Sequence, residues 1–183
     1  MHALLDEADI VIHYNGNKFD IPVLNREFLK HGLGPPSPYK QIDLYRVIKR
    51  AFRFESNKLK AILKELDMEN KLEHEGFKLW TDCMDGKASA WKKLGAYNRK
   101  DVTILEPLYE RLRPWIPNHP SVTALELGMA CPKCGSKKTQ ERGVQVTVTR
   151  VYQRHHCQQC GGWFRSNKSL ATDREERGVN IAC

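Results

Sequence analysis

Long apolar runs, internal repeats and low-complexity tracts are all missing from this chain of 183 residues. A helix that crosses a bilayer needs about 20 consecutive apolar residues, and no segment approaches that length. The first residues, Met1 to Glu7, also lack the basic start and the long apolar stretch of a secretory signal. The sequence therefore excludes a membrane span and a fibre, and it predicts an intracellular protein.

Acidic residues are scarce in one part of the chain. The whole sequence carries 30 Lys and Arg against 22 Asp and Glu, a net charge of +8. Residues 128–172 contain a single acid, Glu141, so that +7 of this charge lies in 45 residues. Such concentrated positive charge favours an acidic partner such as nucleic acid over a neutral metabolite. The basic residues of this segment are Lys133, Lys137, Lys138, Arg142, Arg150, Arg154, Arg165 and Lys168.

A change of composition near residue 114 divides the chain. Pro114, Pro117 and Pro120 fall close together, directly after a long segment with helical and strand periodicity. The length suffices for one ordinary domain and a small module. We therefore predict a first domain over residues 1–115, a proline-containing linker over 116–128, a small module over 129–170 and a flexible tail over 171–183.

The first domain is predicted to combine a buried strand with several helices. Residues 8–14 form a short β-branched run that ends at the turn residue Asn15. Asp20 is in place to cap a following helix, which ends at His31. This pattern predicts an α/β fold. Further helices are expected after a cap at Asp43, around residues 59–66, and from about 88 to 113.

Asp101 falls near the centre of an apolar stripe in the last of these helices. An ionised Asp that is buried without a partner costs several kcal/mol, so the position requires a cation, a hydrogen-bond network or a cleft. Tyr97 lies one turn earlier on the same face. Taken alone, an Asp that accepts a hydrogen bond under a loop and a tyrosine in the core would also account for these residues. The stripe consists of Leu94, Ile104, Leu105, Leu108 and Leu112.

Two short motifs, taken together, support a more specific interpretation. Asn15-x-x-x-Phe19-Asp20 stands where the predicted strand passes into a helix, a common position for ligands in open α/β sheets. Tyr97-x-x-x-Asp101 follows, and Asp101 lies 81 residues after Asp20. In order, spacing and context, residues 1 to about 115 resemble the DEDD 3'-to-5' exonucleases of the tyrosine branch, which have a ribonuclease H-like fold. Without the second motif, Asp20 would read as a simple helix cap.

The resemblance implies a metal-dependent 3'-to-5' exonuclease that acts on DNA. Asp20 and Asp101 would help to hold two divalent cations, Mg²⁺ or Mn²⁺, which suit hard oxygen ligands. Tyr97 would orient the attacking water, and Asn15 and Phe19 would contact the terminal nucleotides, although Phe19 suits the helix core equally well. An enzyme of this kind would serve DNA replication or repair in the cytoplasm of a bacterial cell or of a phage-infected host.

The family's first motif, Asp-x-Glu on the first strand of the sheet, has no counterpart in this chain. Asp6 and Glu7 precede the predicted strand, but their spacing and position differ from the motif. The resemblance therefore implies a partial ribonuclease H-like fold, rich in helix and lacking its first strands and two of its acids. Three explanations remain open: a partner chain supplies the motif, the start is truncated, or the fold serves binding alone.

Four of the six cysteines form two Cys-x-x-Cys pairs, Cys131/Cys134 and Cys157/Cys160. In a reducing compartment this spacing indicates metal ligands rather than disulfides. Each pair is followed by a glycine, which lets the backbone fold back, and together the pairs complete a tetrahedral zinc site with four sulfur ligands. Four filled positions predict a structural zinc ion. The neighbouring His155 and His156 are not needed as ligands, and Cys83 and Cys183 have no spaced partner.

The segment between the two pairs resembles a zinc ribbon, a small β module. Val144, Val146 and Val148 alternate with polar residues as in a strand, and a further strand is expected around Trp163 and Phe164. Basic and aromatic side chains would bind single-stranded or 3'-ended DNA, the alternative being a solvated basic face or a protein-docking ribbon. The candidate contacts are Arg150, Arg154, Arg165 and Lys168, interleaved with Tyr152, Trp163 and Phe164.

The sequence thus predicts two functional classes. The first is a metal-dependent exonuclease whose zinc ribbon holds nucleic acid, with DNA and RNA both open as substrates. The second is a non-catalytic module that binds nucleic acid or protein, or a half-enzyme completed by a partner chain. We interpret Asp43 as a helix cap only, and His13, His31 and His74 as ordinary surface or loop residues.

Overall fold

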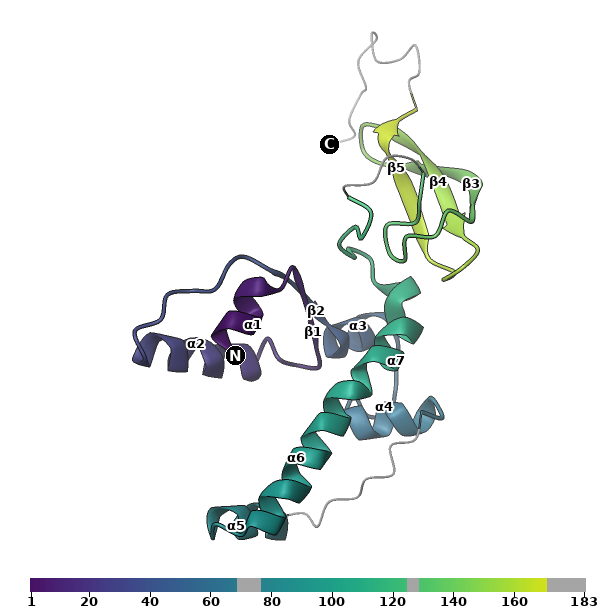
Figure 1. Ribbon diagram of the computed structural model, residues 1–183. Coiled ribbons are helices and arrows are strands. Elements are labelled where there is room, and N and C mark those ends of the chain that lie inside the picture. The colour runs from purple at the N-terminus through teal and green to yellow at the C-terminus, as the bar shows by residue number, and fades with distance from the viewer. Residues whose placement is uncertain (69–76, 125–128, 171–183) are drawn as a thin grey trace. The chain divides into compact units, whose positions relative to one another are not determined.

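The computed structural model describes residues 1–68, 77–124 and 129–170. The chain divides into two compact units, Met1–Leu112 and Arg113–Cys183, which are described separately (Figure 1). The predicted tail over 171–183, with Cys183, and the predicted loop residue His74 lie outside the described residues. Within the described ranges, no helix is long and apolar enough to cross a membrane.

The first unit is a mixed α/β structure built around a strand–helix–strand motif. Strands β1 and β2 pair in parallel, from Ile10 opposite Lys40 to His13 opposite Asp43, and α2 connects them. The α/β fold class expected from the sequence is confirmed, with a small sheet and many helices. The elements are α1 (His2–Glu7), β1 (Ile10–His13), α2 (Asp20–Lys30), β2 (Lys40–Asp43), α3 (Leu44–Ala51), α4 (Leu59–Glu65), α5 (Phe77–Met84), α6 (Ala88–Thr103) and α7 (Leu105–Leu112).

The turn after β1 is tightly constructed. Asn15 has a φ of 61°, a left-handed conformation that asparagine tolerates better than most residues. The next residue, Gly16, is buried, and its N–H donates to Nδ1 of His13 over 3.1 Å. Its carbonyl accepts hydrogen bonds from the backbone N–H groups of Phe19 and Ile21. The turn therefore fixes where α2 begins.

Replacing Gly16 with alanine is expected to destabilise the first unit. An added Cβ would lie 2.8 Å from Cγ of His13, so the ring or the turn would have to shift. Overpacking of this kind costs about 1 to 3 kcal/mol, and urea unfolding followed by far-ultraviolet circular dichroism would measure it. Gly34→Ala is the matched control, since nothing lies within 4 Å of the Cβ it would add. Equal stability of the two variants would contradict this account of the turn.

Two predicted helix caps have different outcomes. Asp43 is the N-cap of α3, and its side chain accepts from the backbone N–H of Tyr45, so that prediction is confirmed. Asp20 as a cap is wrong, because Phe19 is the N-cap of α2 and Asp20 is the first helical residue. The Gly16 carbonyl binds the N–H groups of Phe19 and Ile21, which is why the helix begins without a side-chain cap.

The predicted last helix, from about 88 to 113, is divided at Ile104 into α6 and α7. Pro107 explains the division, because proline has no N–H to offer the carbonyl of Thr103 and its ring crowds that turn. Helices α5 and α6 pack as a hairpin, and α7 packs against α3 and β1. The hairpin core consists of Leu79, Cys83, Ala90 and Leu94.

The second unit contains a three-stranded antiparallel sheet in the order β3-β4-β5. Its strands are β3 (Thr139–Val146), β4 (Val151–Cys157) and β5 (Trp163–Ser169), and a short 3-10 helix, η1 (Arg113–Trp115), precedes them. A bulge interrupts β3 between Glu141 and Val144, where Gly143 has a φ of 67°. The strand predicted around Trp163 and Phe164 is confirmed as β5.

The strand predicted from Val144, Val146 and Val148 is confirmed for Val144 and Val146, which lie in β3, but not for Val148. β3 ends at Val146, and the next residues turn, with the N–H of Thr147 donating to the carbonyl of Arg150 over 2.8 Å. The valines are exposed, Val146 to 72% and Val148 to 74%. Alternation usually marks one buried face, but β3 is an edge strand and its residues after Thr139 are all exposed.

Candidate functional site

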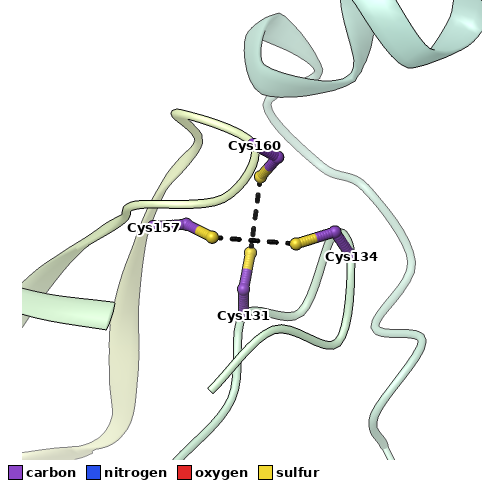
Figure 2. A group of neighbouring side chains, drawn as sticks. All are labelled: Cys131, Cys134, Cys157 and Cys160. Carbon is purple, nitrogen blue, oxygen red and sulfur yellow. Dashed lines mark hydrogen bonds between the residues drawn. The ribbon is translucent and has the colours of Figure 1, made fainter. Parts of the chain in front are cut away.

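The four predicted zinc ligands converge at one end of the ribbon sheet (Figure 2). Cys131 and Cys134 lie in the turn before β3, whereas Cys157 ends β4 and Cys160 follows in the turn to β5. All four Sγ atoms lie within 4.8 Å of one another. Gly135 and Gly161, one residue after each pair, have φ values of 74° and 72°, which L side chains rarely adopt.

The spacing of these sulfur atoms fits a zinc ion. Zinc–sulfur bonds are about 2.3 Å long, so a regular tetrahedron places its sulfur atoms about 3.8 Å apart. Sγ of Cys131 lies 3.8 Å from Sγ of Cys160, and Sγ of Cys134 lies 3.7 Å from Sγ of Cys157. Zinc suits a donor set of four thiolates. The cluster can therefore hold zinc with all four tetrahedral positions filled.

The thiols differ in how readily they lose a proton. Burial raises the pKa of Cys131 to about 12, and burial also raises the pKa of Cys134. Burial works in the same direction at Cys157, but there the backbone N–H groups of Cys160 and Gln159 outweigh it and lower the pKa to about 7. Without a cation, Cys131 would stay protonated at neutral pH. A bound Zn²⁺ would supply the charge that favours thiolates.

Lys133 belongs to this site, although the sequence indicated only a surface charge. The residue is 6% exposed, and its Nζ donates to the carbonyl of Pro114 over 2.6 Å. Burial lowers the pKa of Lys133, while the neighbouring Cys160 and Cys131 oppose that shift. Four thiolates around one Zn²⁺ carry a net charge of −2, and a nearby ammonium offsets part of it. In the sequence, the position of Lys133 between Cys131 and Cys134 was the signal that could have placed it at the zinc site.

Of the residues that the sequence left out of the zinc site, His155, His156 and Cys83 lie outside it, and Cys183 is not among the described residues. His155 is 2% exposed and stacks on Phe164 with ring centroids 5.2 Å apart. Cys83 is buried in the α5–α6 hairpin of the other unit. Within the described residues, the group that could hold a metal ion consists of the four cysteines alone.

The predicted catalytic acids occupy two different environments. Asp20 is exposed at the start of α2, and among the described residues its side chain has no hydrogen bond or ion pair. Asp101 is half-buried in the last turn of α6. Neither residue belongs to a described group of three or more possible metal ligands. The donor chemistry of both carboxylates suits Mg²⁺ or Mn²⁺.

Tyr97 and Asp101 form a hydrogen-bonded pair one turn apart on α6. Burial raises the pKa of Tyr97, and the charge of Asp101 and the hydrogen bond to it act in the same direction. The hydroxyl therefore stays protonated at neutral pH and can donate. The hydrogen bond also supplies one of the compensations that a half-buried carboxylate at position 101 requires.

Asp43 and His13 both bind the turn that follows β1, a contact that the sequence did not predict. The Asp43 side chain is 3% exposed, and its Oδ1 accepts from the backbone N–H groups of Asn15 (2.8 Å) and Tyr45 (3.1 Å). Nδ1 of His13 accepts from the backbone N–H of Gly16, and Nε2 forms a hydrogen bond with Oε1 of Gln41 over 3.1 Å. The His13 side chain is 12% exposed and bound at both ring nitrogens, so the prediction of an ordinary surface or loop residue is wrong.

The remaining predicted nucleic-acid contacts fall on several surfaces. Phe19 is 68% exposed, so it is not part of the helix core. The guanidinium of Arg154 lies 5.1 Å from the centroid of the Trp163 ring, and that of Arg165 lies 3.6 Å from the centroid of Tyr152. The other members of the set are Asn15 in its left-handed turn, Arg150 in the β3–β4 turn, and the exposed Lys168 on β5.

Comparison with known proteins bears on the first unit. A family model described as the RNase_H superfamily matches residues 1–113. No curated protein and no solved structure matches the chain.

Proposed function

The chain belongs to the RNase_H superfamily, whose members are generally hydrolytic nucleases that act on nucleic acid, and on this basis we propose a metal-dependent 3'-to-5' exonuclease acting on DNA. The observation that carries the proposal is the Tyr97–Asp101 pair on α6, within the matched residues. The second acid, Asp20, is the first residue of α2, directly after the turn that follows β1, and its carboxylate does not cap the helix. These residues follow the pattern of the tyrosine branch of the DEDD exonucleases.

The proposed chemistry divides among three side chains. Asp20 and Asp101 would hold Mg²⁺ or Mn²⁺, whose charge activates a water and stabilises the oxygens of a phosphodiester during in-line displacement. Tyr97 keeps its proton and donates it in the hydrogen bond to Asp101, so its hydroxyl oxygen would accept a hydrogen bond from the attacking water and orient it. Asp101 holds the tyrosine hydroxyl in place.

The ribbon would hold the nucleic acid. Zinc gives the module a fixed shape, and its basic residues neutralise phosphates. A nuclease site and a separate basic surface on one chain suit an enzyme that remains on its substrate between cleavages. The ribbon contacts proposed from the sequence are Arg150, Arg154, Arg165 and Lys168.

The second candidate function is that of a non-catalytic binding module or of a half-enzyme that a partner chain completes. It is favoured by the absence of Asp20 and Asp101 from any described group of three or more possible metal ligands. A partner chain that supplied an Asp-x-Glu motif would add two carboxylates to these two. In that case the purified chain would bind single-stranded DNA but would degrade it only when mixed with its partner.

The test is degradation of single-stranded DNA labelled at either end, in Mn²⁺ or Mg²⁺, by the purified chain. We expect Asp20→Asn combined with Asp101→Asn to lower the rate about a hundredfold or more, because several kcal/mol of charge stabilisation would be lost. Tyr97→Phe should lower the rate while leaving the Mn²⁺ dependence unchanged.

Asp67→Asn is the matched control, because Asp67 is an exposed acid in a left-handed conformation that asparagine also adopts. Its rate should equal that of the parent chain. Equal rates for the parent and the Asp20/Asp101 double variant would refute the assigned acids. Loss of nucleotides from the 5' end, or internal cleavage, would refute the proposed direction.

A further inference from the structure

Two arginines lie directly opposite one another on one face of the ribbon sheet. Arg154 on β4 pairs in register with Arg165 on β5, and His156 pairs with Trp163. Because side chains alternate along a strand, Arg154, Arg165 and Trp163 share one face of the sheet. His155 and Phe164 lie on the other face and stack on each other there. One face of the sheet therefore carries the two arginines and Trp163, and the other carries the stacked His155 and Phe164.

Each of these guanidinium groups is held in place by its surroundings. Nε of Arg154 donates to the carbonyl of Arg142 over 2.9 Å, and its guanidinium lies 5.1 Å from the Trp163 ring centroid. Arg165 stacks on Tyr152 at 3.6 Å. A long side chain that is already ordered loses less conformational freedom when it binds. Both groups are thus prepared to bind an anion.

This arrangement costs stability unless an anion is bound. Like charges directly opposite on neighbouring strands repel. Among the described residues no carboxylate forms an ion pair with Arg154 or Arg165. The single acid of the sheet, Glu141, pairs in register with His155 and so lies on the other face. Two ordered guanidiniums on one face of the sheet, without a carboxylate partner, can each bind a phosphate of the same strand.

We propose that this face binds single-stranded nucleic acid, with Arg154 and Arg165 each contacting a backbone phosphate and an unpaired base stacking on Trp163. The inference rests on the proposed role of the ribbon in holding nucleic acid. Trp163 is 46% exposed, so part of its ring is open to a ligand. Stacking on such a ring needs a base that is free of its partner strand, which favours a single strand over a duplex. The planar guanidinium of Arg165 lies over the Tyr152 ring. A second base can stack on that guanidinium.

The test is binding of fluorescein-labelled oligothymidine to the zinc-loaded full chain, without added Mg²⁺ or Mn²⁺. Oligouridine and a duplex hairpin are the other probes, and a fluorescein-labelled poly-glutamate tests a purely acidic peptide. We expect Arg154→Gln with Arg165→Gln to weaken oligothymidine binding about tenfold or more and to reduce the slope of log affinity against log salt by about 1.4, the value for two phosphate contacts on a single strand. Trp163→Leu should weaken binding about 5- to 150-fold and leave the salt slope unchanged.

The matched control is Lys137→Gln with Lys138→Gln, which removes the same charge from exposed residues of the same module but leaves the opposed pair intact. Zinc content and the β-sheet circular dichroism signal, measured on every variant, show that each one is folded. The proposal predicts a clearly smaller loss for the control. Equal losses in the two double variants would overturn it, as would tighter binding of the duplex or of poly-glutamate than of either single strand.

Binding and cleavage are separable in these experiments. If the Asp20/Asp101 test fails while Arg154 and Arg165 still govern binding, the nuclease assignment falls and this interface stands. If the chain degrades DNA but the Arg154/Arg165 variant binds like the parent, the interface falls and the nuclease stands. Comparison of oligothymidine with oligouridine decides whether the face distinguishes DNA from RNA.

Discussion

Removal of the metal by a chelator, or replacement of Cys131 with serine, is expected to unfold residues 129–170 and to leave the helices of Met1–Leu112 folded. In zinc-finger peptides the binding of a structural zinc ion contributes about 10 to 16 kcal/mol. A module of this size cannot replace that contribution with a hydrophobic core. Far-ultraviolet circular dichroism and limited proteolysis would follow the two units of the full chain separately.

The burial pattern of the ribbon explains the size of this effect. Among its described residues, the fully or nearly fully buried side chains are those of Cys131, Cys157, Lys133 and His155. Among the described residues of 129–170 no large aliphatic side chain is buried with them, and the valines of β3 point into solvent, whereas Ile116, earlier in the same unit, is 5% exposed. The zinc ion thus provides the stabilisation that a hydrophobic core provides in a larger domain. Cys83→Ser is the control, because Cys83 lies in the α5–α6 hairpin and its loss should leave the zinc content unchanged. A chelated chain that kept its β-sheet signal and its resistance to protease would contradict this account.

Asp43→Ala is expected to lower the stability of the first unit by about 2 to 4 kcal/mol. The substitution removes the cap of α3, which is worth about 1 kcal/mol, and a hydrogen bond to a charged group, worth about 1.5 to 3. The same Oδ1 atom serves both the N–H of Tyr45 and the N–H of Asn15. Urea unfolding followed by the helical circular dichroism signal would measure the loss.

The Asp43→Asn variant separates the contribution of the two hydrogen bonds from that of the negative charge of Asp43. Asparagine keeps an oxygen that can accept from Asn15 and Tyr45, so its loss should be clearly smaller than that of alanine. Asp85→Ala is a surface control, since the side chain of Asp85 is 58% exposed. Equal losses for alanine and asparagine at position 43 would show that the negative charge, rather than the two hydrogen bonds, holds the turn.

Features of the chain that depend on neighbouring residues were predictable from the sequence. The spacing of the four cysteines is a local property, and the metal geometry that follows from it matches the observed sulfur distances. Tyr97 and Asp101 stand four positions apart, so any helix brings them onto one face. The cap at Asp43 is likewise a local signal. In each case the relevant contact lies within a few residues or is fixed by one ion.

Features that depend on long-range pairing were not predictable. Strand β2 has one apolar residue, Ile42, in four, and it is a strand because it pairs with β1 some 30 residues earlier. That register brings Asp43 to the turn at Asn15, a contact that neither segment indicates alone. The buried state of Lys133 likewise depends on the carbonyl of Pro114, which precedes it by 19 residues.

The bulge in β3 has a consequence for association between copies of the chain. β3 is an edge strand, and Val144 and Val146 are exposed on it, so a regular ladder there would be a template for strand addition and aggregation. The bulge breaks the ladder beside these valines, and the carbonyls of Arg142 and Gly143 are already bound by the side chains of Arg154 and Gln153. A second ribbon therefore finds no regular ladder to extend at the β3 edge, which carries the exposed Val144 and Val146.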